Sequence, residues 1–147
     1  MMAKNTILFL CTGNSCRSQI AEAIVNANYH DDWQGFSAGT NPAGYIHPFA
    51  LKTLEEIGIS HQGESKHLDT FTENEFDLVI TVCDDASNNC PIWLRSGKLI
   101  HLPFPDPAKA TGSDEEILSV FNQVRDGLTL SIKNVLSSYK KSNNTLS

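Results

Sequence analysis

Residues 6–18 read TILFLCTGNSCRS, and this stretch decides the fold. Its first five residues form an apolar run without alternation, which is typical of a strand buried on both faces. From Ser18 to about Tyr29, small and apolar residues recur at helical spacing. The stretch therefore predicts a buried strand, a loop from Cys11 to Arg17, and a helix.

The rest of the chain repeats this alternation of strands and helices. Further strands are expected near Phe36 and over residues 76–82 and 98–102, and helices over residues 48–57 and 113–139. Alternating strands and helices favour a parallel sheet that is covered on both faces. We therefore predict an α/β fold with a four-stranded parallel sheet and helices on both faces.

Length and charge limit the number of domains and the possible partners. The 147 residues fit one domain, predicted over residues 1–140 and followed by a flexible tail over residues 141–147. A net charge of −6 argues against a nucleic-acid partner, so an anionic substrate must be drawn by a local positive site. The first apolar run is too short for a signal sequence or a membrane helix. We expect a cytoplasmic protein without a membrane partner, whose four cysteines are thiols at rest.

The loop between the first strand and the first helix has the form of an oxyanion site. Five residues separate Cys11 from Arg17, and Ser18 follows. Such a loop can curl so that its N–H groups converge on one tetrahedral oxyanion, while the arginine grips two oxygens. The same positive potential favours the thiolate of Cys11, to which Ser18 can donate a hydrogen bond. We predict that Cys11 is the nucleophile and that the anion is bound by Thr12, Gly13, Asn14, Ser15, Cys16 and Arg17.

Two further features fall at predicted strand ends, where ligands bind in sheets of this type. Cys83 follows the third strand, and Asp106 lies in a proline-rich loop after the fourth. We expect both side chains to share one site with Cys11. Cys16, by contrast, is expected to pack beneath the loop rather than to take part in redox chemistry, since free cysteines are commonly buried.

With these motifs the sequence resembles the low-molecular-weight tyrosine phosphatases, and more closely their thioredoxin-coupled arsenate reductase branch. The resemblance extends over residues 6–139 and includes Ser37-Ala38-Gly39, residues 81–91 (TVCDDASNNCP) and Asp106-Pro107-Ala108. It implies that Asp106 is the general acid that protonates the departing oxide. It also implies arsenate as substrate, with phosphate or sulfate as weak analogues, and thioredoxin as reductant, with glutaredoxin as the alternative. We expect a monomer without a cofactor.

A reductase of this kind must deliver two electrons, which points to the two later cysteines. Attack of Cys83 on the sulfur of the Cys11 adduct would release arsenite, and attack of Cys90 on Cys83 would then free Cys11. If residues 83–90 were helical, the Cα atoms of Cys83 and Cys90 would lie roughly 10.5 Å apart. A disulfide needs these atoms within about 7 Å. We therefore predict that this segment rearranges on oxidation.

Several alternatives remain open at the level of sequence. The chain could be a phosphomonoester phosphatase, although Ala108-Lys109-Ala110 replaces the aromatic residues that usually follow Asp-Pro in that branch, or a sensor that binds oxyanions without turnover. Cys83 and Cys90 could fill the core or hold zinc, but the five histidines lack paired ligand spacing. Residues 60–66 (SHQGESK) lack the arrangement by which some related reductases hold potassium, so no specific metal is predicted.

Overall fold

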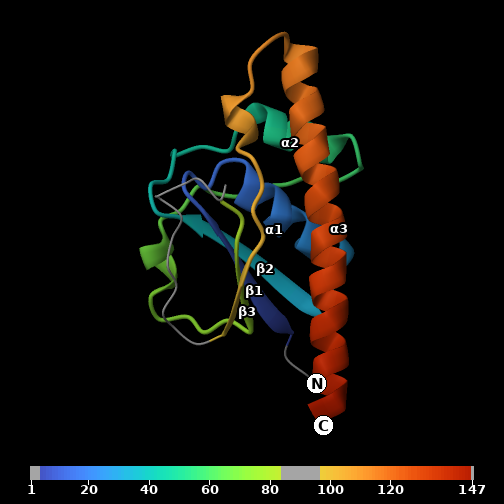
Figure 1. The fold of residues 1–147 in the computed structure, drawn as a ribbon. Helices are drawn as coiled ribbons and strands as arrows, with labels where there is room; N and C mark the ends of the chain where they lie inside the picture. Colours follow the sequence, from blue (N-terminus) through green and yellow to red (C-terminus); the bar gives the residue numbers. More distant parts are fainter. Residues whose placement is uncertain (1–3, 84–96, 147) are drawn as a thin grey trace.

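The computed structural model describes residues 4–83 and 97–146, in which strands and helices alternate along the chain (Figure 1). The elements are β1 (Asn5–Cys11), α1 (Arg17–Asn28), β2 (Trp33–Gly39), α2 (Pro48–Glu55), η1 (Leu68–Phe71), β3 (Leu78–Thr81), β4 (Lys98–His101), η2 (Pro107–Lys109) and α3 (Asp114–Leu146), where η denotes a short 3₁₀ helix. Every strand and helix predicted from the sequence is therefore present.

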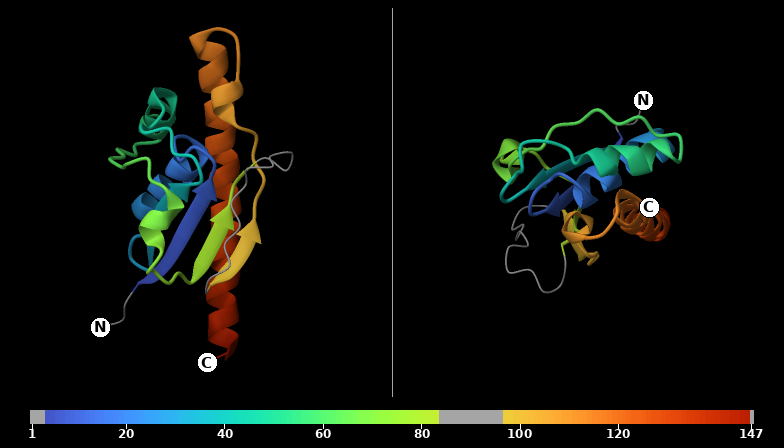
Figure 2. Two further views of the ribbon diagram at one scale, coloured as in Figure 1. Left: turned by 90° about the vertical axis from the view of Figure 1, so that its left-hand side faces the viewer. Right: turned by 90° about the horizontal axis from the view of Figure 1, so that it is seen from above.

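The four strands form one parallel sheet in the order β2-β1-β3-β4. In the left view of Figure 2, β1, β3 and β4 lie side by side and run in the same direction. Residues 7–10 of β1 are wholly buried, which explains their unbroken apolar run, because a central parallel strand is covered on both faces. The predicted α/β fold with a four-stranded parallel sheet is confirmed.

Side chains of β1 alternate between two apolar clusters, one on each face of the sheet. Ile7 and Phe9 pack with buried side chains of α1, α2 and α3. Leu8 and Leu10 pack on the other face with Phe71 of η1. Helices therefore lie on both faces, with the three α-helices grouped on one side, as the views of Figures 1 and 2 show.

The long helix α3 begins at the predicted capping box. The Ser113 amide donates to Glu116 Oε1 at 3.1 Å, and the Glu116 amide donates to Ser113 Oγ at 3.2 Å. The helix continues to Leu146 rather than ending near Tyr139, so residues 141–146 of the predicted tail are helical. Lysines at 140 and 141 favour this continuation, because lysine is a good helix former. No helix in the described part of the chain is both long and apolar enough to cross a membrane.

Candidate active site

The carboxyl edge of the sheet brings most of the predicted site residues together. Cys11 is the last residue of β1, and Asp106 lies in the loop between β4 and η2. Both line a pocket of about 40 Å³ at this edge. The other residues that line the pocket are Gly13, Asn14, Ser15, Cys16, Arg17 and Ala108. The expectation that the loop and the proline-rich segment meet is therefore confirmed by the geometry.

The carbonyl groups of the loop point away from the pocket. Backbone amides of Asn41, Ala43 and His47 donate to the carbonyl oxygens of Thr12, Gly13 and Ser15, respectively, at 2.8–3.0 Å. Because a trans peptide is planar, its N–H points opposite to its C=O, so the N–H groups of the loop turn inward. The amide of Asn14 accordingly lies 3.3 Å from Cys11 Sγ. An inward ring of N–H groups beside a sulfur nucleophile is suited to a tetrahedral oxyanion.

Two residues give the loop its shape. Asn14 adopts a left-handed backbone with φ 49°, which asparagine tolerates better than most residues. Gly39 of the Ser37-Ala38-Gly39 motif lies so close that a Cβ there would overlap the Thr12 carbonyl. The end of β2 must therefore be glycine for the loop to pack against it. This contact gives a physical reason for the Ser37-Ala38-Gly39 motif, which only the resemblance to the family singles out in the sequence.

Ser18 is placed to donate a hydrogen bond to the sulfur of Cys11. Its Oγ lies 2.9 Å from Cys11 Sγ and 2.8 Å from Asn14 Nδ2. The amide nitrogen of Asn14 can only donate, so Ser18 must accept from it, and the hydroxyl proton is left for the sulfur. All three residues are buried, which strengthens a hydrogen bond to a charged sulfur. The predicted support of the Cys11 thiolate by Ser18 therefore has suitable geometry.

A buried glutamine that the sequence analysis missed holds Asn14 in place. Gln19 Nε2 donates to Asn14 Oδ1 at 3.0 Å and to the Glu64 carbonyl at 2.8 Å. Gln19 Oε1 lies 2.9 Å from His61 Nε2, which must carry the proton because an amide oxygen only accepts. A chain of hydrogen bonds thus runs from His61 through Gln19, Asn14 and Ser18 to Cys11.

Two buried ionisable groups lie at the outer end of this chain. His61 Nε2 is 3.8 Å from Glu22 Oε2, and Glu22 Oε1 accepts a 2.7 Å hydrogen bond from Ser37. Burial raises the pKa of Glu22, and the Ser37 hydroxyl opposes this effect. Burial, followed by the charge of Lys66, lowers the pKa of His61. Both shifts favour the uncharged forms of these two side chains.

Arg17 connects the loop to the proline-rich segment. It is buried, and its Nη1 donates to the Phe104 carbonyl at 3.0 Å. Its Nη2 lies 3.8 Å from Asp106 Oδ2, while Asp106 Oδ1 accepts from the Ala108 amide at 3.0 Å. The Nε of Arg17 is also buried, and no described residue accepts a hydrogen bond from it. A buried donor without a partner in a pocket lined by Cys11 fits the predicted grip on an oxyanion.

A glycine in the middle of α3 fixes the position of this segment. A Cβ at Gly127 would lie 2.8 Å from Cε1 of Phe104, which is closer than carbon atoms normally approach. The Phe104 ring therefore rests directly on the helix backbone. Because the carbonyl of Phe104 binds Arg17, this contact links α3 to the arginine and to the loop that carries Asp106.

Cys16 differs from Cys11 although both lie in the loop. Burial raises the pKa of the Cys16 thiol to about 12, with the Ser15 hydroxyl acting in the opposite direction. Cys16 therefore stays protonated at neutral pH and cannot act as a nucleophile there. This agrees with the expected packing role.

Cys83 is the second residue after β3, the strand that pairs with β1. It is wholly buried and belongs to the same apolar cluster as Cys11. Leu10 pairs with Thr81, and the amide of Val82 donates to the Leu10 carbonyl at 2.9 Å. This hydrogen bond continues the pairing with β1 one residue beyond the end of β3, and Cys83 is the next residue in the chain.

The second relay thiol, Cys90, and the predicted rearrangement of residues 84–90 lie outside the described residues. Cys11 and Cys16 are free thiols in this structure. Within residues 4–83 and 97–146, no group of three or more histidine, cysteine or acidic side chains is arranged to hold a metal ion.

Comparison with known proteins gives the same fold and a consistent set of relatives. The model of the low-molecular-weight phosphotyrosine protein phosphatase family matches residues 6–145. An arsenate reductase of Bacillus licheniformis is 44% identical over 133 residues, covering 90% of this chain and 95% of that protein. An arsenate reductase of Shouchella clausii is 42% identical over 135 residues, with the same coverage.

Solved structures agree with these relatives. An arsenate reductase in its phosphate-binding state superposes with a TM-score of 0.73 at 26% identity, covering 91% of this chain and 98% of the other. A thioredoxin-dependent arsenate reductase of Corynebacterium glutamicum gives a TM-score of 0.66 at 26% identity and covers 92% of this chain and 63% of the other.

Proposed function

Since this chain belongs to the low-molecular-weight phosphotyrosine protein phosphatase family, we propose that it is an arsenate reductase in which Cys11 attacks arsenate and thioredoxin supplies the electrons. The arsenate reductases among its relatives support the reaction, and the thioredoxin-dependent neighbour supports the partner. The observation that carries the assignment is the buried Cys83 thiol, which follows β3 at the same sheet edge and belongs to the same apolar cluster as Cys11. A phosphatase, which completes its cycle with water, needs no such second thiol.

The first step is a nucleophilic displacement at arsenic. The loop N–H groups and Arg17 bind the oxyanion with its arsenic atom above Cys11 Sγ. The thiolate, supported by Ser18, attacks arsenic, and Asp106 donates its proton to the oxygen that leaves as water. The product is a Cys11 thioester of arsenic(V). Ala108 and the small pocket volume of about 40 Å³ fit an inorganic oxyanion better than an aromatic ester.

Two thiols then supply two electrons. The Cys83 thiolate attacks Cys11 Sγ, the sulfur–arsenic bond breaks, and its electron pair stays on arsenic, which leaves as arsenite. Cys90 attacks Cys83 Sγ and releases the Cys11 thiolate. The net change is oxidation of Cys83 and Cys90 to a disulfide, which thioredoxin reduces. For this exchange the segment after Cys83 must bring Cys90 within disulfide distance.

A coupled assay tests this function. The protein is mixed with arsenate, thioredoxin, thioredoxin reductase and NADPH, and consumption of NADPH is followed. We expect sustained, thioredoxin-dependent turnover by the natural sequence. Cys16→Ser serves as the matched control and should retain most of the activity, whereas Cys11→Ser and Cys83→Ser should lose it. Sustained turnover by Cys83→Ser would contradict the relay.

The same assay separates the alternatives. Hydrolysis of p-nitrophenyl phosphate without arsenate reduction would identify a phosphatase, which the shared loop also favours as a weak side activity. Arsenate binding without any product would identify an oxyanion sensor. Dependence on glutaredoxin and glutathione would change the partner and leave the chemistry at Cys11 unaltered. We further propose that the protein works in the cytoplasm, because the free thiols of Cys11 and Cys16 suit a reducing compartment. We also propose that it works as a monomer.

A further inference from the structure

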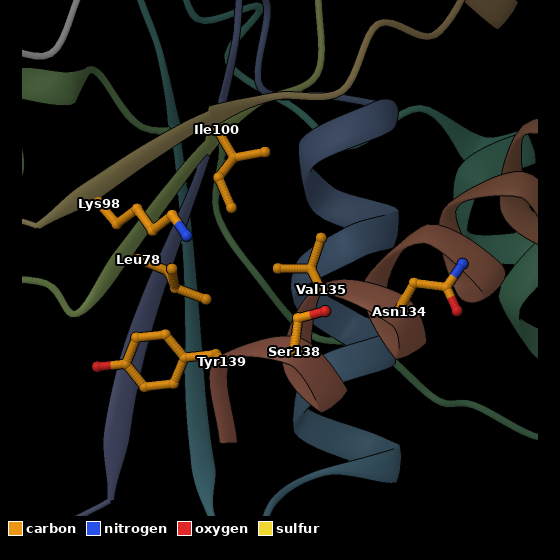
Figure 3. A pocket seen from close by; sticks show the side chains of 7 residues that line it. All are labelled: Leu78, Lys98, Ile100, Asn134, Val135, Ser138 and Tyr139. Atoms are coloured by element: carbon orange, nitrogen blue, oxygen red, sulfur yellow. The ribbon is translucent and has the colours of Figure 1, made fainter. Parts of the chain in front are cut away.

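A second cavity lies at the opposite end of the sheet from Cys11. Its volume is about 260 Å³, and it is lined by β3, β4 and residues 134–139 of α3 (Figure 3). Leu78 and Lys98 are the first residues of β3 and β4, whereas the oxyanion pocket lies beyond the last residues of the strands. The cavity is therefore separate from the proposed active site. The described residues that line it are Leu78, Lys98, Ile100, Asn134, Val135, Ser138 and Tyr139.

The walls of this cavity are apolar side chains that the fold leaves partly uncovered. Val135 and Tyr139 continue the core-facing stripe of α3, yet both are only half-buried. The described sheet ends at β4, so Ile100 is the last apolar side chain opposite them. Figure 3 shows Leu78 and Ile100 facing Val135 across the space, with the ring of Tyr139 at one end.

One cation, the exposed Lys98, lies beside this apolar space. The Lys98 side chain extends from β4 past Leu78, and its Nζ is directed toward the cavity (Figure 3). Lys98 is the charged member of the described lining, and Asn134 and Ser138 supply polar groups from α3. The net charge of −6 makes the molecule as a whole repel anions. An anion that binds in this cavity must therefore be attracted by the ammonium group of Lys98.

From this combination we propose that the cavity binds a small carboxylate with an apolar tail, the carboxylate pairing with Lys98 Nζ and the tail lying between Leu78, Ile100 and Val135. At about 30 Å³ for each water-sized group, the cavity holds roughly nine such groups. An aliphatic acid of about eight carbons matches this size. Apolar burial favours the tail, while the single ammonium selects the charge of the head group.

Titration of the ¹⁵N-labelled full-length protein with sodium octanoate tests the site. Amide shifts in two-dimensional NMR spectra should saturate with a 1:1 stoichiometry and should be largest in β4 and over residues 134–139. Trp33 fluorescence offers a second readout in a Trp93→Phe background, because the Trp33 ring lies 5.2 Å from that of Tyr139. 1-Octanol, which has the same tail without the charge, should bind at least tenfold more weakly.

Matched variants separate this site from general surface binding. Lys98→Met should weaken octanoate binding at least tenfold, and Val135→Trp should abolish it by filling the cavity. Lys133→Met removes an exposed charge from α3, the helix that also carries Val135, and should leave octanoate binding unchanged. Arsenate reduction should be unaltered in Lys98→Met, so the cavity and the proposed reductase can fail independently.

Three results would overturn this assignment. Octanol that binds as tightly as octanoate would exclude the role of Lys98. Shifts scattered over the surface, or shifts that do not saturate, would show adventitious binding only. Shifts of the lining residues that depend on protein concentration, together with a dimer in sedimentation, would show that a second copy of the chain covers this face.

Discussion

Replacement of Gly127 by alanine tests how the fold positions Asp106, the proposed general acid. Gly127 lies inside α3, where alanine alone would stabilise the helix by about 1 kcal/mol. The new Cβ would lie 2.8 Å from Phe104 Cε1, whereas carbon atoms pack at about 3.5–4.0 Å. The ring must therefore move by roughly 1 Å, and we expect the shift to reach the Phe104 carbonyl, which binds Arg17. We expect a loss of activity without a matching loss of stability.

The size of the effect follows from the geometry of the site. A displacement of about 1 Å in a catalytic group reduces rates by as much as about 10²-fold. Arsenate reduction by Gly127→Ala should therefore fall about 10- to 100-fold in kcat. The free energy of unfolding should change by less than about 1 kcal/mol, since the gain in helix propensity offsets the contact with the ring.

The coupled assay and urea denaturation measure the two quantities on the same samples. Ser137→Ala, an exposed substitution on the same helix, serves as the control and should retain full activity. The double variant Phe104→Leu/Gly127→Ala should recover part of the activity, because leucine is shorter than the ring. Full activity of Gly127→Ala, or equal losses in the single and double variants, would refute the positioning role.

Three further predictions concern the loop and its support. Ser18→Ala should slow alkylation of Cys11 by iodoacetamide at pH 7 by about tenfold, because a hydrogen bond to a charged group contributes about 1.5–3 kcal/mol; an unchanged rate would exclude donation to the thiolate. Asp106→Asn should reduce the rate of arsenite release about 10²- to 10⁴-fold with little change in arsenate binding, measured by single-turnover kinetics. Burial lowers the pKa of His61 below its ordinary value of 6.5. As the pH falls, His61 therefore takes up a proton in the unfolded chain before it does so in the folded protein, and the free energy of unfolding decreases below about pH 6.5. His61→Gln should show a smaller drop in melting temperature between pH 7.5 and about pH 5.5, and an identical drop would contradict the buried neutral state.

Local patterns in the sequence are sufficient for the frame of the fold. The apolar run before Cys11 predicts a central strand, and the spacing of Cys11, Arg17 and Ser18 predicts an oxyanion loop, because both features depend on residues that are close in sequence. The meeting of Cys11 and Asp106 also follows, since parallel strands bring their carboxyl ends to one edge.

The support behind the site could not be predicted in this way. Gln19 and His61 are 42 positions apart, and a single hydrogen bond between them leaves no periodic signal in the sequence. The contact of Phe104 with Gly127 depends on the path of a loop and on the exact rotation of α3, which sequence spacing leaves undetermined. A glycine inside a long apolar-striped helix is the one local clue, because it costs helix stability unless packing requires it.

The most direct measurement of the proposed reaction is the disulfide formed in a single turnover. Cys90→Ser protein is mixed with one equivalent of arsenate without a reductant, quenched with acid and alkylated, and its peptides are mapped by mass spectrometry. We predict one arsenite per protein and a disulfide between Cys11 and Cys83. Arsenite release with Cys83 still alkylated as a free thiol, or with the disulfide at Cys16 instead, would contradict the account.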